Sequence, residues 1–99
     1  MRITSSRDFE RLLREGARRS VSGYTFYVGQ RHEGPPRLGV LVSRRHSPKA
    51  VRRNAIKRSI REAFRLEQER IGALDLLVRP PYGARPGRDM IASLRPLLA

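Results

Sequence analysis

The chain has 99 residues, with no cysteine, 22 Lys or Arg and nine Asp or Glu, and its formal net charge is +13. This length suits one domain, residues 1–99, and is too short for two lobes around an active site, while the lack of cysteine excludes disulfides and thiolate metal sites. Because no apolar run is long enough for a transmembrane helix or a signal peptide, we expect a soluble, cytoplasmic protein whose charge suits a polyanionic partner.

Residues 4–16 predict a short helix. Ser5 is a candidate N-cap, Asp8 follows three residues later, and Gly16 suits the C-terminal end. The apolar residues on one side of this helix are Phe9, Leu12 and Leu13. We expect the helix to pack on the rest of the chain through that side.

Residues 19–30 are rich in β-branched and aromatic side chains and predict one strand. A Gly-Pro-Pro loop follows and leads to a second strand at residues 37–43, which is compatible with an antiparallel hairpin. The second strand is apolar on both faces, so we expect it to be central, and Gly39 indicates the close approach of another backbone. Alternation gives the first strand two faces, with Tyr24, Phe26 and Val28 on one and Thr25 and Tyr27 on the other.

Residues 47–65 predict an amphipathic helix that extends towards Arg70. Ser47 is the predicted N-cap and Pro48 the first helical residue. The basic side of this helix contains Arg53, Asn54, Lys57, Arg58, Arg61 and Arg65. The opposite, packing side contains Ala55, Ile56, Ile60, Ala63 and Leu66.

The positive charge is concentrated on and before this helix. Residues 44–65 contain nine Lys or Arg and one acid, a net charge of +8. A solvated surface helix normally mixes the two signs, whereas Lys57 with Arg61 and Arg61 with Arg65 are like-charge pairs at i, i+4 spacing. A polyanion would reverse that cost, so we expect this side, together with Arg44 and Arg45, to contact the phosphates of a nucleic acid.

Residues 71–79 predict a short apolar strand, and a strand, a helix and a strand in succession suggest parallel pairing. A turn-rich loop at residues 80–86 precedes a final helix, residues 87–98, whose last turn Pro96 should disturb. Three residues of this helix should face inward: Met90, Ile91 and Leu94. The pattern predicts an α+β domain with three to four strands and about three helices.

The sequence has no recognisable catalytic or metal motif. His32 and His46 are expected to be exposed loop residues, and Glu62 to pair with Arg58 at i, i+4 spacing. A hydrolase site would need clustered carboxylates or a His with an orienting partner, and neither is visible. Any catalysis should therefore belong to something that the chain binds.

One stretch matches a known signature: residues 50–64, AVRRNAIKRSIREAF, resemble that of the bacterial ribonuclease P protein component. This is the protein subunit of the ribonucleoprotein that removes the 5′ leader from precursor tRNA. Three further segments resemble the same family in the right order: RDFERLLREG at 7–16, YTFYV at 24–28 and RLGVLVSRR at 37–45. The resemblance therefore covers almost the whole chain.

The resemblance implies that RNA is the catalyst of an endonuclease in which this chain is the non-catalytic subunit. It implies two partners, the catalytic RNA and the precursor tRNA leader, with no membrane and no small-molecule substrate. No cofactor would be bound by the protein itself, and Mg²⁺ would act with the catalytic RNA. The implied RNA contacts are Arg53, Asn54, Lys57, Arg58 and Arg61, and Phe9 and Tyr27 would line the leader cleft.

The family also implies a left-handed crossover between parallel strands, against the usual right-handed rule. Two positions depart from its pattern: Ala55 replaces a second Arg, and Leu13 replaces a residue that is often aromatic. A generic RNA-binding or ribosomal protein is the alternative function, since it shares the charge and size but not the ordered segments. A stand-alone nuclease is a third possibility, which cleavage by RNA-free protein would reveal.

Overall fold

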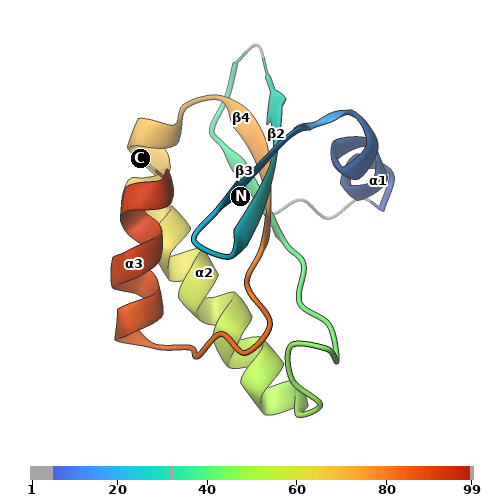
Figure 1. Cartoon of the computed structure of the whole chain (residues 1–99). Helices are drawn as coiled ribbons and strands as arrows, with labels where there is room; N and C mark the ends of the chain where they lie inside the picture. The colour runs from blue at the N-terminus through green and yellow to red at the C-terminus, as the bar shows by residue number, and fades with distance from the viewer. Residues whose placement is uncertain (1–5, 32, 99) are drawn as a thin grey trace.

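A mixed β-sheet separates two layers of helices in the computed structural model, which describes residues 6–31 and 33–98 (Figure 1). Helices α2 and α3 cover one face of the sheet, and α1 lies against the other. The elements are α1 (Ser6–Glu15), β1 (Ala17–Val21), β2 (Tyr24–Gln30), β3 (Arg37–Val40), α2 (Ala50–Ile71), β4 (Leu74–Arg79) and α3 (Arg88–Leu98). The α+β fold class predicted from the sequence is confirmed; the predicted cap at Ser5 lies outside the described residues.

Strands β1 and β2 form a tight hairpin, so the prediction of one strand over residues 19–30 was wrong. The chain reverses at Ser22 and Gly23, whose φ angles are 52° and 85°. Positive φ at both central residues is the pattern of a type I′ turn, which matches the twist of the two flanking strands. Val21 before the turn and the aromatic and β-branched residues of β2 after it give one nearly unbroken strand-like run, in which the turn is easily overlooked.

Strand β4 is central, and the sheet order is β1-β2-β4-β3. Strand β4 pairs antiparallel with β2 and parallel with β3, so the predicted parallel strand-helix-strand unit is confirmed. The predicted hairpin of β2 with β3 was wrong, as was the central position of β3, which is a four-residue edge strand. Strand β4 occupies the centre because its Leu76, Leu77 and Val78 side chains are all buried. The handedness of the crossover stays an implication of the family resemblance.

The two faces of β2 supply two different cores, as its alternation predicted. The larger core joins the sheet to α2 and α3 through Tyr24, Phe26, Leu38, Ile56, Ile60, Ala63, Phe64, Leu76, Val78, Met90, Leu94 and Leu98. The smaller core joins the sheet to α1 through Leu12, Tyr27 and Leu77, with the partly buried Phe9 and Leu41 packed against them. Helix α1 is therefore held by few apolar contacts compared with α2 and α3.

Helix α2 begins at Ala50, and its N-cap is Lys49 rather than the predicted Ser47. Lys49 makes no side-chain cap bond, and the buried Ser47 hydroxyl instead accepts the Lys49 backbone N–H at 3.2 Å, within the turn before the helix. The helix runs to Ile71, as its amphipathic pattern predicted. Leu66 was wrongly assigned to the packing side, because Phe64 and Glu67 are buried there instead and Leu66 is 41% exposed.

Helix α3 packs along α2 (Figure 1). Met90 and Leu94 are buried as predicted, and the partly buried Ile91 packs against the same core. The predicted disturbance of the last turn by Pro96 was wrong, because the helix continues through Pro96 to Leu98. The contact between the helices also contains a buried carboxylate, Glu67, whose Oε1 accepts a hydrogen bond from Arg95 Nε at 2.8 Å. Of the helices in residues 6–31 and 33–98, none is long and apolar enough to cross a membrane.

Candidate nucleic-acid interface

The basic face of α2 consists of Arg53, Asn54, Lys57, Arg58, Arg61 and Arg65. Asn54, Arg58 and Arg65 are exposed, while the other three are half-buried. The single acid beside them, Glu62, pairs with Arg65 at i, i+3 spacing, with Nε and Oε2 3.0 Å apart, and not with Arg58 as predicted. The hydrogen bond from Arg65 lowers the pKa of Glu62 and raises the pKa of Arg65. This leaves a positive surface along the helix.

Arg53 has a structural role at the start of this face. Its Nη1 donates to the carbonyl oxygens of Ser47 and Pro48, both at 3.0 Å. Neither carbonyl belongs to the helix, so the guanidinium links the first turns of α2 to the preceding loop. Because Lys49 supplies no side-chain cap, this link fixes where the loop enters the helix.

The loop of residues 43–47 is held by His46, which is buried and not exposed as predicted. The Ser43 backbone N–H donates to His46 Nδ1 at 3.1 Å, and His46 Nε2 lies 2.9 Å from the Pro80 carbonyl oxygen. Only the neutral ring with its proton on Nε2 satisfies both partners. No local pattern reveals this burial, because Pro80 is 34 residues away in sequence.

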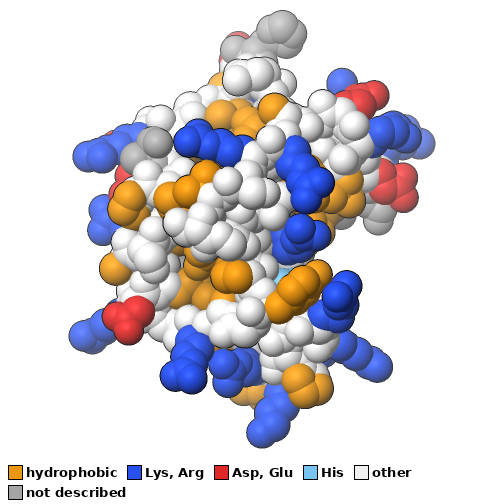
Figure 2. Space-filling model, in the orientation of Figure 1, with side chains coloured by type: hydrophobic (Ala, Val, Ile, Leu, Met, Phe, Trp, Pro, Cys, Tyr) orange, Lys and Arg blue, Asp and Glu red, His pale blue; other side chains and the backbone are white. Residues whose placement is uncertain are grey.

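Arg44 and Arg45 lie exposed on this loop, next to the N-terminal end of α2. Figure 2 shows Lys and Arg side chains gathered at that end of the molecule. The Arg45 Cζ atom lies 4.8 Å from the centre of the Tyr82 ring. The loop and the start of α2 therefore place several Lys and Arg side chains at the same end of the molecule.

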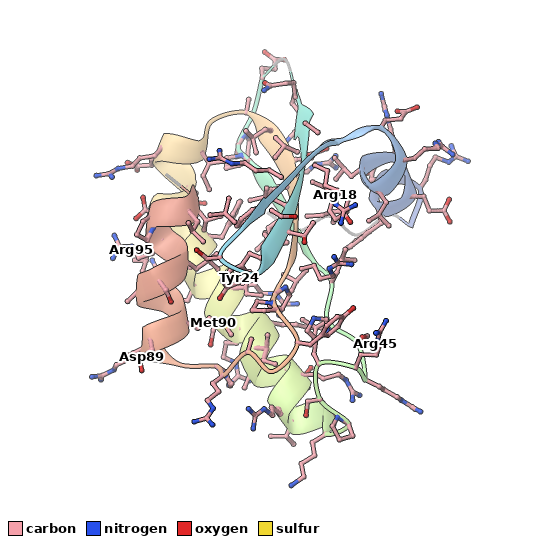
Figure 3. The ribbon with its side chains drawn as sticks, in the orientation of Figure 1. Arg18, Tyr24, Arg45, Asp89, Met90 and Arg95 are labelled. Atoms are coloured by element: carbon pink, nitrogen blue, oxygen red, sulfur yellow. The ribbon has the colours of Figure 1, made fainter. Side chains whose placement is uncertain are left out.

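The second candidate surface is the face of the sheet on the α1 side. Tyr27 is 8% exposed there, and Phe9 packs beside it from α1. Arg18 is the cross-strand partner of Tyr27, so its side chain lies on the same face, where Figure 3 shows it pointing towards α1. Arg79 of β4 also lies on this face, since its Nη2 is 3.3 Å from Thr25 Oγ1. Arg18, Tyr27 and Arg79 therefore share the α1-side face of the sheet.

Gly39 makes room for the contact between α1 and the sheet. A Cβ atom at this position would overlap Leu77 Cδ2 and would lie 2.9 Å from Phe9 Cζ. The prediction that another backbone approaches Gly39 was wrong, because side chains make the close approach. Glycine allows the Phe9 ring to rest directly on β3.

An ion-pair network also links α1 to strands β3 and β4. Arg37 Nε and Nη2 donate to the two carboxylate oxygens of Asp75 at 2.7 and 2.6 Å, and Nη1 lies 3.4 Å from Asp8 Oδ2 in the first turn of α1. The hydrogen bond to Asp75 is the main reason why the pKa of Arg37 is raised.

Within residues 6–31 and 33–98, no group of three or more His, Cys, Asp or Glu side chains is arranged to hold a metal ion.

The sequence model of the family described as Ribonuclease P matches residues 1–97. The chain belongs to the ribonuclease P protein family. The ribonuclease P protein component of Nitrosococcus oceani is 35% identical over 96 residues, which cover 95% of this chain and 81% of that relative. The recognition made from residues 50–64 is confirmed.

Solved structures of this family share the fold. The RNase P protein of Staphylococcus aureus superposes with a TM-score of 0.84 at 32% identity, covering 98% of this chain and 91% of that one. The RNase P protein of Thermotoga maritima gives a TM-score of 0.72 at 27% identity, covering 95% and 80%. The three-layer arrangement is thus that of ribonuclease P proteins.

The predicted RNA-binding residues lie together on α2 and the 43–47 loop, while the predicted cleft residues, Phe9 and Tyr27, lie in the smaller core. Their RNA contacts stay a prediction. Sequence reasoning missed Arg18 and Arg79, which join Tyr27 on one face of the sheet. A turn assigned at Ser-Gly would have placed Arg18 opposite Tyr27.

Proposed function

We propose that this ribonuclease P protein binds the catalytic RNA through the basic face of α2 and the 43–47 loop. Membership of the family makes the chain the protein subunit of a ribonucleoprotein endoribonuclease that processes tRNA 5′ ends, and a generic RNA-binding role is not favoured. One observation carries the proposed contact surface. The Lys and Arg side chains that give residues 44–65 their net charge of +8 are all exposed or half-buried.

The leader of precursor tRNA would lie on the α1 side of the sheet. There Arg18 and Arg79 supply positive charge for phosphates, and Phe9 and Tyr27 line the site, as the family resemblance implies. The burial of Tyr27 favours a supporting role, in which the ring holds α1 on the sheet. A single strand then crosses a polar surface whose shape depends on this packing.

In this proposal the RNA carries the chemistry, with Mg²⁺ bound to RNA and phosphates, and the protein supplies positive charge. Lys and Arg side chains neutralise phosphates and release the counterions condensed on them. The protein would therefore reduce the concentration of Mg²⁺ that the catalytic RNA needs. We further propose that the subunit works in the cytoplasm, where precursor tRNA is made.

The salt dependence of binding tests the proposed surface. If Lys57 neutralises one phosphate, Lys57→Ala should reduce the slope of log K against log[salt] for the catalytic RNA by roughly 0.7 to 0.9. Arg14→Ala is the matched control, because it removes one charge from an exposed position of α1, in the opposite layer. An unchanged slope for Lys57→Ala, or an equal reduction for Arg14→Ala, would contradict the proposed surface.

A further inference from the structure

Tyr82, in the loop between β4 and α3, is an exposed aromatic residue that no role described above explains. Tyr82 is one of the large hydrophobic residues that are exposed in residues 6–31 and 33–98, and its exposed fraction is 50%. A lone exposed aromatic needs no special explanation. Tyr82 differs because its ring is held in place by neighbours of a particular chemistry.

The Tyr82 ring packs on the buried His46 ring, which is itself held in place. The centres of the Tyr82 and His46 rings are 4.6 Å apart, with the planes tilted by 45°. His46 is itself buried and bonded to two backbone groups, at Ser43 and Pro80. Two loops distant in sequence thus meet at His46 and fix the position of the Tyr82 ring, which reduces the entropy lost when a ligand stacks on it.

A positive charge already lies over this ring. The Arg45 guanidinium is 4.8 Å from its centre, within the range of a cation–π contact. Arg45 itself is exposed. A guanidinium over an exposed ring is weakly held, so a planar ligand can replace it.

Beside the ring is an open hollow of about 300 Å³, lined by residues 40–43, His46, Arg79 and Tyr82. This volume is at the lower end of the range for small-ligand sites. The lining contains no acidic residue. The hollow also lies between the two proposed RNA surfaces, since Arg79 belongs to the α1-side face of the sheet and the 43–47 loop to the surface that continues onto α2.

We propose that Tyr82 and Arg45 form a stacking site for one unpaired RNA base, an inference that rests on the proposed function. The base takes the place of the Arg45 guanidinium on the ring, and Arg45 turns to a phosphate of the same strand. Stacking on an aromatic ring accepts any base and suits single-stranded RNA, while the arginine adds a charge contact. The base belongs either to the precursor leader or to an unpaired segment of the catalytic RNA.

The test compares Tyr82→Leu, which keeps apolar volume against His46 but cannot stack a base, with Tyr82→Phe, which can. Three affinities are measured: the protein for the catalytic RNA, and the reconstituted holoenzyme for leader-bearing precursor and for mature tRNA. Tyr82→Leu should weaken one of them roughly 5- to 100-fold, and Tyr82→Phe should stay near wild type. Leu66→Ala, which removes another exposed apolar side chain, is the control and should change none.

The pattern of losses identifies the source of the base. Loss for precursor alone assigns the base to the leader, and loss for the catalytic RNA assigns it to that RNA. As a direct readout, the fluorescence of 2-aminopurine in the responding strand should be quenched by wild type and Tyr82→Phe but not by Tyr82→Leu. Wild-type affinities for all three RNAs in Tyr82→Leu would overturn the stacking site while leaving the proposed function intact. Failure of the wild-type protein to bind the catalytic RNA would instead overturn the proposed function.

Discussion

Replacing Tyr27 by alanine separates a packing role from direct contact with RNA. Tyr27 is 8% exposed and packs in the smaller core with Leu12 of α1 and Leu77 of β4. Truncating a buried aromatic residue to alanine costs about 3–5 kcal/mol. At about 4–8 °C per kcal/mol for a domain of this size, the midpoint of thermal unfolding should fall by at least about 12 °C. Because the ring is covered, binding of leader-bearing precursor and of mature tRNA should weaken together.

Leu12→Ala is the matched control for this experiment, since Leu12 is 6% exposed in the same core and carries no ring. Thermal unfolding is followed by circular dichroism, and both tRNA affinities are measured at a temperature below the midpoints of both variants. A wild-type midpoint in Tyr27→Ala would refute the packing role. The packing role would also be refuted if Tyr27→Ala, but not Leu12→Ala, lost about 1–3 kcal/mol of binding free energy for the leader-bearing precursor alone, because a lost base stack has that effect.

Two further predictions concern packing inside the fold. Gly39→Ala should destabilise the protein by about 1–3 kcal/mol, because the new Cβ atom would overlap Leu77 and crowd Phe9. In a double-mutant cycle of unfolding free energies, Leu77→Val should relieve part of that cost, whereas additive costs would show that the two positions do not clash. Arg95→Ala should lower the free energy of unfolding by about 1–3 kcal/mol, because it leaves the buried Glu67 carboxylate without its hydrogen bond, and adding Glu67→Leu should recover most of that loss. Both variants are measured by urea unfolding, and a double variant less stable than Arg95→Ala alone would contradict this reasoning.

Much of the candidate interface was predictable because its signals are local. The basic face of α2 follows from helical spacing alone, and the order of elements follows from runs of apolar residues. The start of α2 was less predictable. Ser47 and Pro48 have the composition of a helix start, yet the Ser47 hydroxyl bonds within the preceding turn and Arg53 binds the two carbonyls. The start of the helix thus depends on the side chain of Arg53, six residues after Ser47.

The remaining features depend on contacts between distant parts of the chain. The position of β4 between β2 and β3 is decided by burial on both faces of the sheet, which a single strand does not reveal. His46 is buried because Pro80 supplies its second hydrogen-bond partner, and Tyr82 becomes a neighbour of Arg45 only when those two loops meet. The turn at Ser22 and Gly23, by contrast, was a local signal that was missed.

The Mg²⁺ dependence of precursor cleavage tests the central claim most directly. A bacterial ribonuclease P RNA is assayed over a range of Mg²⁺ concentrations, alone and with equimolar protein, and the protein is also assayed without RNA. A chain with a net charge of +13 that binds this RNA should shift cleavage to lower Mg²⁺ and cleave nothing by itself. An unchanged Mg²⁺ dependence, or cleavage of precursor tRNA by the protein free of RNA, would contradict the account.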